Sequence, residues 1–437
     1  MKKRTITAAV AATAASAMLA LAGCSASGPA VEPTPTAAGP EDITFWVIGG
    51  DTPQALRDYL VEQYAEVNGG ELTIEEQGWG DVLTKLQTQL PDAANTPDVT
   101  EIGNTWSPTF TSVGAFSDIT DLVPELGGSD LLPSFVEVGV YDGKNYALPY
   151  YFGSRYNFYR KDLYAAAGVD VPKTLGEFSE NAIALTTPTQ SGFYIGGSDW
   201  RNGVSWIFAY GGDLAKNEGG NWVSTLADPA SVEGLTALQE LYTGASHAPV
   251  TESDSTPWVN INNNEATGAP EAATIIAPGW AHWSIGDLTP DPADATKTVA
   301  TWNDDVFGTF VLPGVDGGVA PVFAGGSNIG ISAASTHQAG ARDLLRIIFS
   351  PEYQQMLGEN GLGPANLKYT SSLGDDQFAT ALAESAAGSK LTPAAPGWAA
   401  VEASGLLEEF FSKVNGGGDV AALAAEYDAK IDAIING

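Results

Sequence analysis

The chain has 437 residues, of which 44% are hydrophobic and 10% aromatic. This composition is typical of a folded protein of two or three domains and excludes general disorder. The formal net charge of -34 argues against nucleic acid as a partner, because so acidic a surface repels phosphate backbones. Basic side chains that lie among aromatic residues, such as Arg155 and Arg201, therefore become candidates for a binding site.

The N-terminus has the pattern of a secretory signal. Lys2-Lys3-Arg4 forms a basic region, Ile6 to Leu21 is an Ala-rich apolar region, and Cys24 follows small residues. Cys24 is the only cysteine, so an internal disulfide is impossible and the thiol needs another role. Because Leu21-Ala22-Gly23-Cys24 resembles the lipobox of bacterial lipoproteins, we expect a signal peptide over 1–23 and lipidation of Cys24.

The stretch 24–40 is predicted to be a flexible linker, since proline, alanine and glycine dominate it. No later segment has the ~18 consecutive apolar residues of a membrane-spanning helix. The two acyl chains of a lipid anchor suffice for stable membrane attachment. We therefore expect a soluble body tethered to the extracytoplasmic face of the cell membrane.

The first part of the body alternates strands and helices. Strands are predicted near 43–48, 72–76 and 98–102, with amphipathic helices after each of them. This alternation predicts βαβ units and a largely parallel sheet, whose ligands lie beyond the carboxyl ends of the strands. The carboxyl ends of the strands together form one rim of the sheet. The residues expected on this rim, each following a strand, are Asp51, Trp79, Asn104 and Trp106.

The aromatic-rich segment from Leu148 to Leu163 is predicted to be a strand that crosses from one lobe to another. Period-two geometry places Tyr151, Gly153 and Arg155 on one face. We expect that face to contact a ligand; an ordinary half-buried strand is the alternative.

The remaining chain continues with helices near 175–184, 229–242, 339–349 and 351–359, with strands between them and a helical end after Asp375. Further candidates for ligand contact occupy predicted loops: Asp199, Trp200, Arg201, Trp280, Trp283 and Trp398.

Eleven tryptophans fit a carbohydrate site, because sugars offer apolar C–H faces to aromatic rings and hydroxyls to carboxylates, amides and guanidiniums. The six at predicted loop positions are Trp79, Trp106, Trp200, Trp280, Trp283 and Trp398. Trp46, Trp206 and Trp222 lie inside regular patterns and are expected in the core.

Several stretches resemble the extracellular solute-binding proteins of ABC importers, in the sugar-binding branch that includes the maltose-binding proteins. They are Ile43-Thr44-Phe45-Trp46, Thr96-Pro97-Asp98-Val99, Gly143-Lys144-Asn145-Tyr146-Ala147-Leu148-Pro149-Tyr150, Tyr159-Arg160-Lys161-Asp162-Leu163, Tyr210-Gly211-Gly212, Gly325-Gly326-Ser327-Asn328-Ile329-Gly330-Ile331, Ser350-Pro351-Glu352-Tyr353-Gln354 and Gly361-Leu362-Gly363-Pro364-Ala365. Their order and spacing cover nearly the whole mature chain.

The resemblance implies a two-lobed α/β fold of the type II periplasmic-binding-protein class, each lobe a mostly parallel sheet flanked by helices, with a ligand cleft between. It implies an N-terminal lobe of 41–152 plus 306–363 and a C-terminal lobe of 153–305 plus 364–437. It also implies a monomer that binds a carbohydrate, expected to be an oligosaccharide, closes around it and delivers it to the permease subunits. Gly326, inside a matching stretch, joins the expected ligand site. Gly153 stands where the maltose-binding pattern has a ligand-contacting side chain, which argues against maltose itself.

Two other functional classes share part of this pattern. Glycoside hydrolases also combine tryptophans with paired carboxylates, so a secreted carbohydrate-active enzyme is the alternative function. The sequence lacks HExxH, GxSxG, Walker and CxxC motifs, and its three histidines lack metal-ligand spacing, so no catalytic residue, metal or cofactor is predicted. A cell-surface adhesin would more often contain tandem repeats, and none is found.

Overall fold

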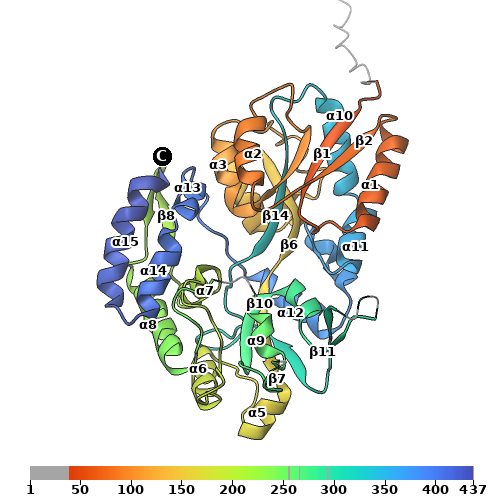
Figure 1. The fold of residues 1–437 in the computed structure, drawn as a ribbon. Helices are drawn as coiled ribbons and strands as arrows, with labels where there is room; N and C mark the ends of the chain where they lie inside the picture. Colours follow the sequence, from red (N-terminus) through yellow and green to blue (C-terminus); the bar gives the residue numbers. More distant parts are fainter. Residues whose placement is uncertain (1–38, 254–255, 265, 293, 295, 437) are drawn as a thin grey trace, which may run out of the picture. The chain divides into compact units, whose positions relative to one another are not determined.

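The computed structural model describes residues 39–253, 256–264, 266–292, 294 and 296–436. Its larger sheet has six strands in the order β15-β6-β14-β3-β1-β2 (Figure 1). Their bounds are β1 Ile43–Ile48, β2 Leu72–Gln77, β3 Val99–Gly103, β6 Ala147–Gly153, β14 Gly325–Ile331 and β15 Gly363–Pro364. Cys24 and the predicted signal and linker up to residue 38 lie outside the described residues.

Strand direction in this sheet follows from how the chain connects the strands. β1 pairs in parallel with β2 and β3, and helices connect these three strands as the βα alternation predicts. β14 is antiparallel to both β3 and β6, and β15 is antiparallel to β6. The prediction of a mostly parallel sheet is therefore correct only for β1, β2 and β3.

Helices cover both faces of the larger sheet. Phe45 and Val47 pack with side chains of α1, α10 and α11, whereas Trp46 and Ile48 pack with those of α2 and α3. Successive residues of a strand point to opposite faces, so burial on both sides explains the continuous apolar run of β1. The helices in this part are α1 Gln54–Val67, α2 Val82–Gln89, η1 Asn104–Trp106, α3 Ser107–Ser112, η2 Gly128–Asp130, α4 Pro133–Val138, α10 Gln338–Ile348 and α11 Pro351–Glu359.

The second sheet has three strands in the order β10-β7-β13: β7 is Arg155–Arg160, β10 Thr274–Pro278 and β13 Phe307–Phe310. Both neighbours of β7 run antiparallel to it, so the prediction of a mostly parallel second sheet is wrong. β7 enters this sheet directly from β6 of the larger sheet, and β10 and β13 lie on either side of it and run in the opposite direction.

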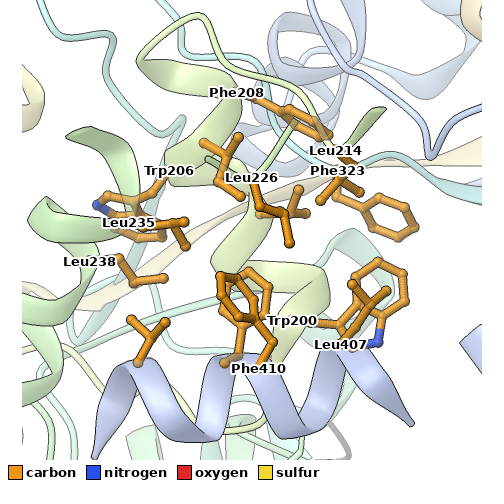
Figure 2. Close-up of a cluster of buried hydrophobic side chains, with 14 of the residues drawn as sticks. Trp200, Trp206, Phe208, Leu214, Leu226, Leu235, Leu238, Phe323, Leu407 and Phe410 are labelled. Atoms are coloured by element: carbon orange, nitrogen blue, oxygen red, sulfur yellow. The ribbon is translucent and has the colours of Figure 1, made fainter. Parts of the chain in front are cut away.

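Helices of the C-terminal half enclose the largest buried cluster (Figure 2). Trp206 and Phe208 of α7 pack there with Leu235 of α8 and Phe410 of α14. The helices are α5 Lys161–Ala167, α6 Leu175–Ala184, α7 Trp200–Ala209, α8 Pro229–Gly244, α9 Trp258–Ile261, η3 Gly279–Ser284, η4 Leu367–Leu373, α12 Gln377–Ala387, α13 Trp398–Ala403, α14 Leu406–Asn415 and α15 Val420–Ile435. Three strand pairs complete the fold: β4 Val140–Tyr141 with β5 Lys144–Asn145, β8 Ala215–Glu218 with β9 Asn221–Ser224, and β11 Asp287–Pro290 with β12 Thr298–Thr301.

The chain passes between the two sheets at Ser154, because β6 belongs to the larger sheet and β7 to the smaller. This is the crossing predicted from the aromatic segment. β13 pairs with β7, so Phe307–Phe310 belongs with the smaller sheet and not with the N-terminal lobe, to which the predicted range 306–363 assigned it. The return to the larger sheet occurs between β13 and β14.

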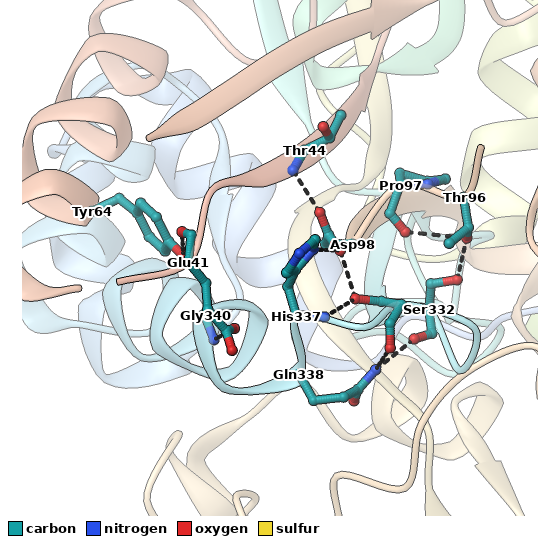
Figure 3. A network of polar contacts seen from close by, with 11 residues as sticks. Glu41, Thr44, Tyr64, Thr96, Pro97, Asp98, Ser332, His337, Gln338 and Gly340 are labelled. Carbon is teal, nitrogen blue, oxygen red and sulfur yellow. Dashed lines mark hydrogen bonds and ion pairs between the residues drawn. The ribbon is translucent and has the colours of Figure 1, made fainter. Parts of the chain in front are cut away.

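A buried polar network ties the start of the larger sheet together (Figure 3). Asp98 Oδ2 accepts from the backbone N–H of Thr44, and its Oδ1 accepts from the Ser335 hydroxyl and lies 3.1 Å from His337 Nδ1. These contacts join β1, the segment before β3 and the start of α10. Their place at the amino end of the strands gives them a structural role, away from the predicted rim.

Candidate functional site

Asp51, Trp79 and Trp106 come together at the carboxyl ends of β1, β2 and β3. Trp79 Nε1 donates a 3.1 Å hydrogen bond to Asp51 Oδ2. The rings of Trp79 and Trp106 meet edge to face with centroids 5.7 Å apart. Trp79 remains 41% exposed and Trp106 is half-buried, so aromatic surface and a carboxylate are offered to solvent side by side. This is the chemistry that a sugar ring requires.

Tyr151 connects the crossing strand to this rim. Its phenol oxygen lies 3.1 Å from Asp51 Oδ2 and 3.0 Å from Glu101 Oε1. The Ser327 hydroxyl of β14 donates to the same phenol over 3.4 Å. Side chains from three other segments therefore converge on this one oxygen atom, next to the carboxylate that Trp79 contacts.

Glu101 belongs to this group, although the sequence pattern did not point to it. It lies in the middle of β3 and is fully buried, and its Oε2 accepts a 2.8 Å hydrogen bond from the backbone N–H of Ile48. Burial raises the pKa of Glu101 to about 7, against hydrogen bonds that lower it. Partial burial of the carboxylate likewise raises the pKa of Asp51, although the residue as a whole is exposed. No local signal indicated Glu101, because Val99-Thr100-Glu101-Ile102 mixes polar and apolar residues like many strands.

Asn104 follows β3 as predicted but is buried, and its amide donates to the carbonyl oxygen of Ala324 over 3.2 Å. It holds the η1 turn against the segment that precedes β14, which supports a positioning role. Gly326 has a φ of +134°, and a Cβ there would lie 2.5 Å from the Tyr151 carbonyl oxygen. Close strand pairing accounts for this glycine. At Gly153, by contrast, the nearest atom to an added Cβ is the Gly325 carbonyl oxygen at 3.8 Å, so a side chain would fit.

A second polar group surrounds Arg155 at the start of β7. Arg155 is 4% exposed, its Nε donates to Asn202 Oδ1 over 2.8 Å, and its guanidinium lies 5.0 Å from the Phe323 ring centroid. Asp199 caps α7 by accepting from the backbone N–H of Asn202. Arg155 and Asp199, which were both predicted to contact the ligand, therefore both bind Asn202. No sequence signal indicated Asn202.

Trp200 and Trp398 differ from their predicted loop positions: each is the first residue of a helix, α7 or α13, and each is buried. Their indole N–H groups are satisfied internally, Trp200 by Glu408 and Trp398 by Glu402, at 3.0 and 2.9 Å. Arg201 extends over the Trp200 ring, with the guanidinium carbon 4.6 Å from the centroid. The prediction that both tryptophans lie in loops is wrong. The turn before each helix ends at the N-cap residue, Asp199 or Gly397, so each tryptophan already belongs to the helix and its ring is buried.

Trp280 and Trp283 lie on η3, directly after β10, as predicted from the strand end. They are 47% and 58% exposed. Trp280 packs edge to face on Trp258 with centroids 4.8 Å apart. His282, which lies between Trp280 and Trp283 in the sequence, stacks on Phe378. Burial lowers the pKa of His282. This exposed aromatic surface is separate in sequence from the rim at Trp79 and offers a second stacking surface.

Trp46 and Trp206 are buried and Trp222 is half-buried, in line with their predicted core positions. The described part of the chain contains no cluster of three or more His, Cys, Asp or Glu side chains arranged to hold a metal ion. Within the same residues, no helix is long and apolar enough to span a bilayer.

Two surface cavities lie elsewhere. One of about 250 Å³ is lined by Ser134, Asp213, Trp222, Lys390 and Thr392, among others. The other, of about 300 Å³, is lined by residues that include Thr44, Trp46, Glu75 and Thr96. Neither includes a predicted ligand residue, so the site hypothesis depends on the side-chain groups described above.

Comparison with known proteins gives consistent matches. The family described as "Bacterial extracellular solute-binding protein" matches residues 49–355. The diacetylchitobiose binding protein DasA of Streptomyces coelicolor is 32% identical over 366 residues, covering 83% of this chain and 82% of DasA.

Solved structures agree with the fold. The sugar-binding protein MalE of Xanthomonas citri has a TM-score of 0.75 at 21% identity, covering 90% of this chain and 97% of MalE. The GacH receptor of Streptomyces glaucescens has a TM-score of 0.70 at 22% identity, covering 90% and 98%. These likenesses confirm the predicted α/β fold of the maltose-binding-protein type.

Proposed function

Because this chain belongs to the bacterial extracellular solute-binding protein family, we propose that it captures a carbohydrate and delivers it to the permease of an ABC importer. The observation that carries this proposal is the strand-end group in which exposed Trp79 donates to Asp51 beside Trp106. An aromatic face next to an oriented carboxylate suits a sugar ring with its C–H face and hydroxyls.

An oligosaccharide is the proposed ligand class. Aromatic surface occurs in two places, at Trp79 with Trp106 and at Trp280 with Trp283, which suits a ligand longer than one ring. The relative DasA is named for diacetylchitobiose and MalE for sugar binding. N-acetylated chitooligosaccharides are therefore the first ligands to test, with maltooligosaccharides second.

The proposed site comprises the predicted residues on both sheets. Asp51, Trp79, Trp106 and Tyr151 supply the part on the larger sheet; Arg155, Asp199, Arg201, Trp280 and Trp283 supply the other. Asn104, Trp200 and Trp398 support it from buried positions, and Gly326 supports it from a half-buried one. Closure follows from population shift: a ligand that contacts both parts favours the closed state by its differential affinity.

We propose that the protein acts as a monomeric receptor that does not turn over its ligand. A lipid on Cys24 would hold it at the extracytoplasmic face of the membrane. Replacing Cys24 by Ala should release the protein from the membrane fraction into the medium, measured by fractionation and labelling with a radioactive fatty acid. Membrane retention of Cys24→Ala without the label would contradict the anchor.

Isothermal calorimetry with diacetylchitobiose, longer chitooligosaccharides, maltooligosaccharides and monosaccharides tests the proposed function. We expect saturable binding to at least one sugar, with each sugar recovered intact by chromatography after long incubation. Absence of binding across the panel would contradict the carbohydrate proposal. Cleaved product at catalytic rates would support the alternative of a glycoside hydrolase.

A further inference from the structure

Glu101 contacts the predicted ligand residue Tyr151, but it is fully buried in β3 and cannot meet a sugar itself. We infer that Glu101 is a positioning residue that stores one proton in a chain Glu101–Tyr151–Asp51 and so holds Asp51 as a hydroxyl acceptor. This inference rests on the proposed function and deepens it by naming what orients the ligand-binding carboxylate.

The hydroxyl hydrogens around the Tyr151 phenol are too few for its contacts when both carboxyl groups are ionised. Three oxygen pairs meet at the Tyr151 phenol: with Asp51 Oδ2 at 3.1 Å, with Glu101 Oε1 at 3.0 Å and with Ser327 Oγ at 3.4 Å. If both carboxyl groups were ionised, only the phenol and serine hydrogens would serve three contacts. One contact would then bring two lone pairs together in a buried site, which is costly. A single added proton completes the set.

The added proton belongs on Glu101 Oε1. Glu101 is fully buried, whereas Asp51 lies in the exposed turn after β1 and its Oδ2 also accepts from Trp79. Ionising the deeper group costs more, because no water solvates it. With Glu101 neutral, Glu101 and Ser327 donate to the phenol oxygen, and the phenol donates to Asp51. The Ile48 N–H remains on Glu101 Oε2.

The proton on Glu101 also orients the Asp51 carboxylate for a ligand. Tyr151 and Trp79 both donate to Oδ2 of Asp51, which orients the carboxylate and leaves Oδ1 outside these two contacts. Oδ1 is therefore the oxygen that we assign to a sugar hydroxyl. When Glu101 loses its proton, the phenol hydrogen turns to Glu101, and Asp51 keeps only Trp79 as a donor beside a second negative charge.

Other charged and titratable groups lie near the hydrogen-bonded residues Glu101, Tyr151 and Asp51. Tyr150 of β6 contacts the hydroxyls of Thr52 and Tyr353, at 3.0 and 2.8 Å. Arg57 of α1 pairs with Glu76 at 2.9 Å and donates to the Gly49 carbonyl oxygen. The guanidinium of Arg57 is thus engaged with Glu76 and with the turn after β1.

The test compares wild type with Glu101→Gln in calorimetry at about pH 6 and about pH 8.5, using the sugar that binds wild type. The introduced glutamine can donate its amide hydrogen to Tyr151 and accept from Ile48, but it does not titrate. We expect wild type to lose about tenfold in affinity at the higher pH, the coupling that corresponds to one pKa unit. We expect Glu101→Gln to change less than about twofold.

A readout without ligand separates this inference from the proposed function. Infrared difference spectra should contain a protonated carboxyl C=O band at about pH 6 that Glu101→Gln lacks. If the band is present but no sugar binds, the stored proton stands and the carbohydrate proposal fails. If sugar binds with equal pH dependence in both proteins, or the band is missing from wild type, the stored proton is overturned.

Discussion

The phenol oxygen of Tyr151 lies 3.1 Å from Oδ2 of Asp51, although 100 residues separate them in the sequence. Tyr151 belongs to β6, immediately before the chain crosses to the smaller sheet, and Asp51 follows β1. The contact therefore joins the crossing segment to the strand-end rim. It makes half of the proposed site a single hydrogen-bonded unit before any ligand arrives, which lowers the entropy that binding must remove.

Replacing Asp51 by Asn should weaken carbohydrate binding about 10- to 100-fold while the fold remains intact. The substitution removes the charge that strengthens a hydrogen bond to a sugar hydroxyl, a loss on the order of 1.5–3 kcal/mol. Calorimetry measures the affinity and circular dichroism the fold. Asp58→Asn, on the exposed face of α1, is the matched control and should bind as wild type does. Equal affinity of Asp51→Asn and wild type would remove Asp51 from the site.

Trp79→Ala and Trp280→Ala should each reduce affinity without lowering stability by more than about 0.5 kcal/mol, because both rings are substantially exposed. Loss of one stacking surface is expected to cost about tenfold or more in affinity. Ligand titration followed by tryptophan fluorescence and calorimetry gives the result. Tyr141→Ala is the control, since that aromatic is similarly exposed at 42% but lies on the β4–β5 hairpin. Unchanged binding in both tryptophan variants contradicts the stacking surfaces.

Trp200→Ala should destabilise the protein by about 3–5 kcal/mol, because it removes a buried ring from the largest apolar cluster and leaves Glu408 without its indole donor. Urea denaturation measures the change. Trp283→Ala, at a position 58% exposed, is the comparison and should change stability by less than about 0.5 kcal/mol. A stable Trp200→Ala protein that loses only ligand affinity would restore the original prediction of a direct contact.

Glu101→Gln should remove a pH dependence of stability. The pKa of Glu101 is about 7 in the folded protein, above its ordinary 4.5, so the folded state holds a proton that the unfolded chain has released. Stability contributed by this group is therefore lost as pH rises from 4.5 through 7, up to about 3 kcal/mol. In denaturant titrations, we expect the free energy of unfolding of Glu101→Gln to rise by that amount relative to wild type between about pH 4.5 and pH 8.5. A constant difference across this range would mean that Glu101 keeps its ordinary pKa.

Elements with strong local signals could be predicted from the sequence. The apolar run of β1, the amphipathic helix α1 and the strand ends after β1, β2 and β3 were predictable, because side-chain periodicity and glycine turns are local properties. That is why Asp51, Trp79 and Trp106 could be placed together at one rim. The ordered similarities along the chain identified the fold class.

The partners that these residues meet became known only from the folded chain. Contacts between segments far apart in the sequence decide three features. They are the antiparallel pairing of β7, the burial of the Trp200 and Trp398 rings, and the burial of Glu101. Glu101 has no unusual local pattern. Its pKa is raised because the packing of β3 with β14 and β6 buries the carboxyl group, while the contacts with Ser327 and Tyr151 that this packing creates lower it.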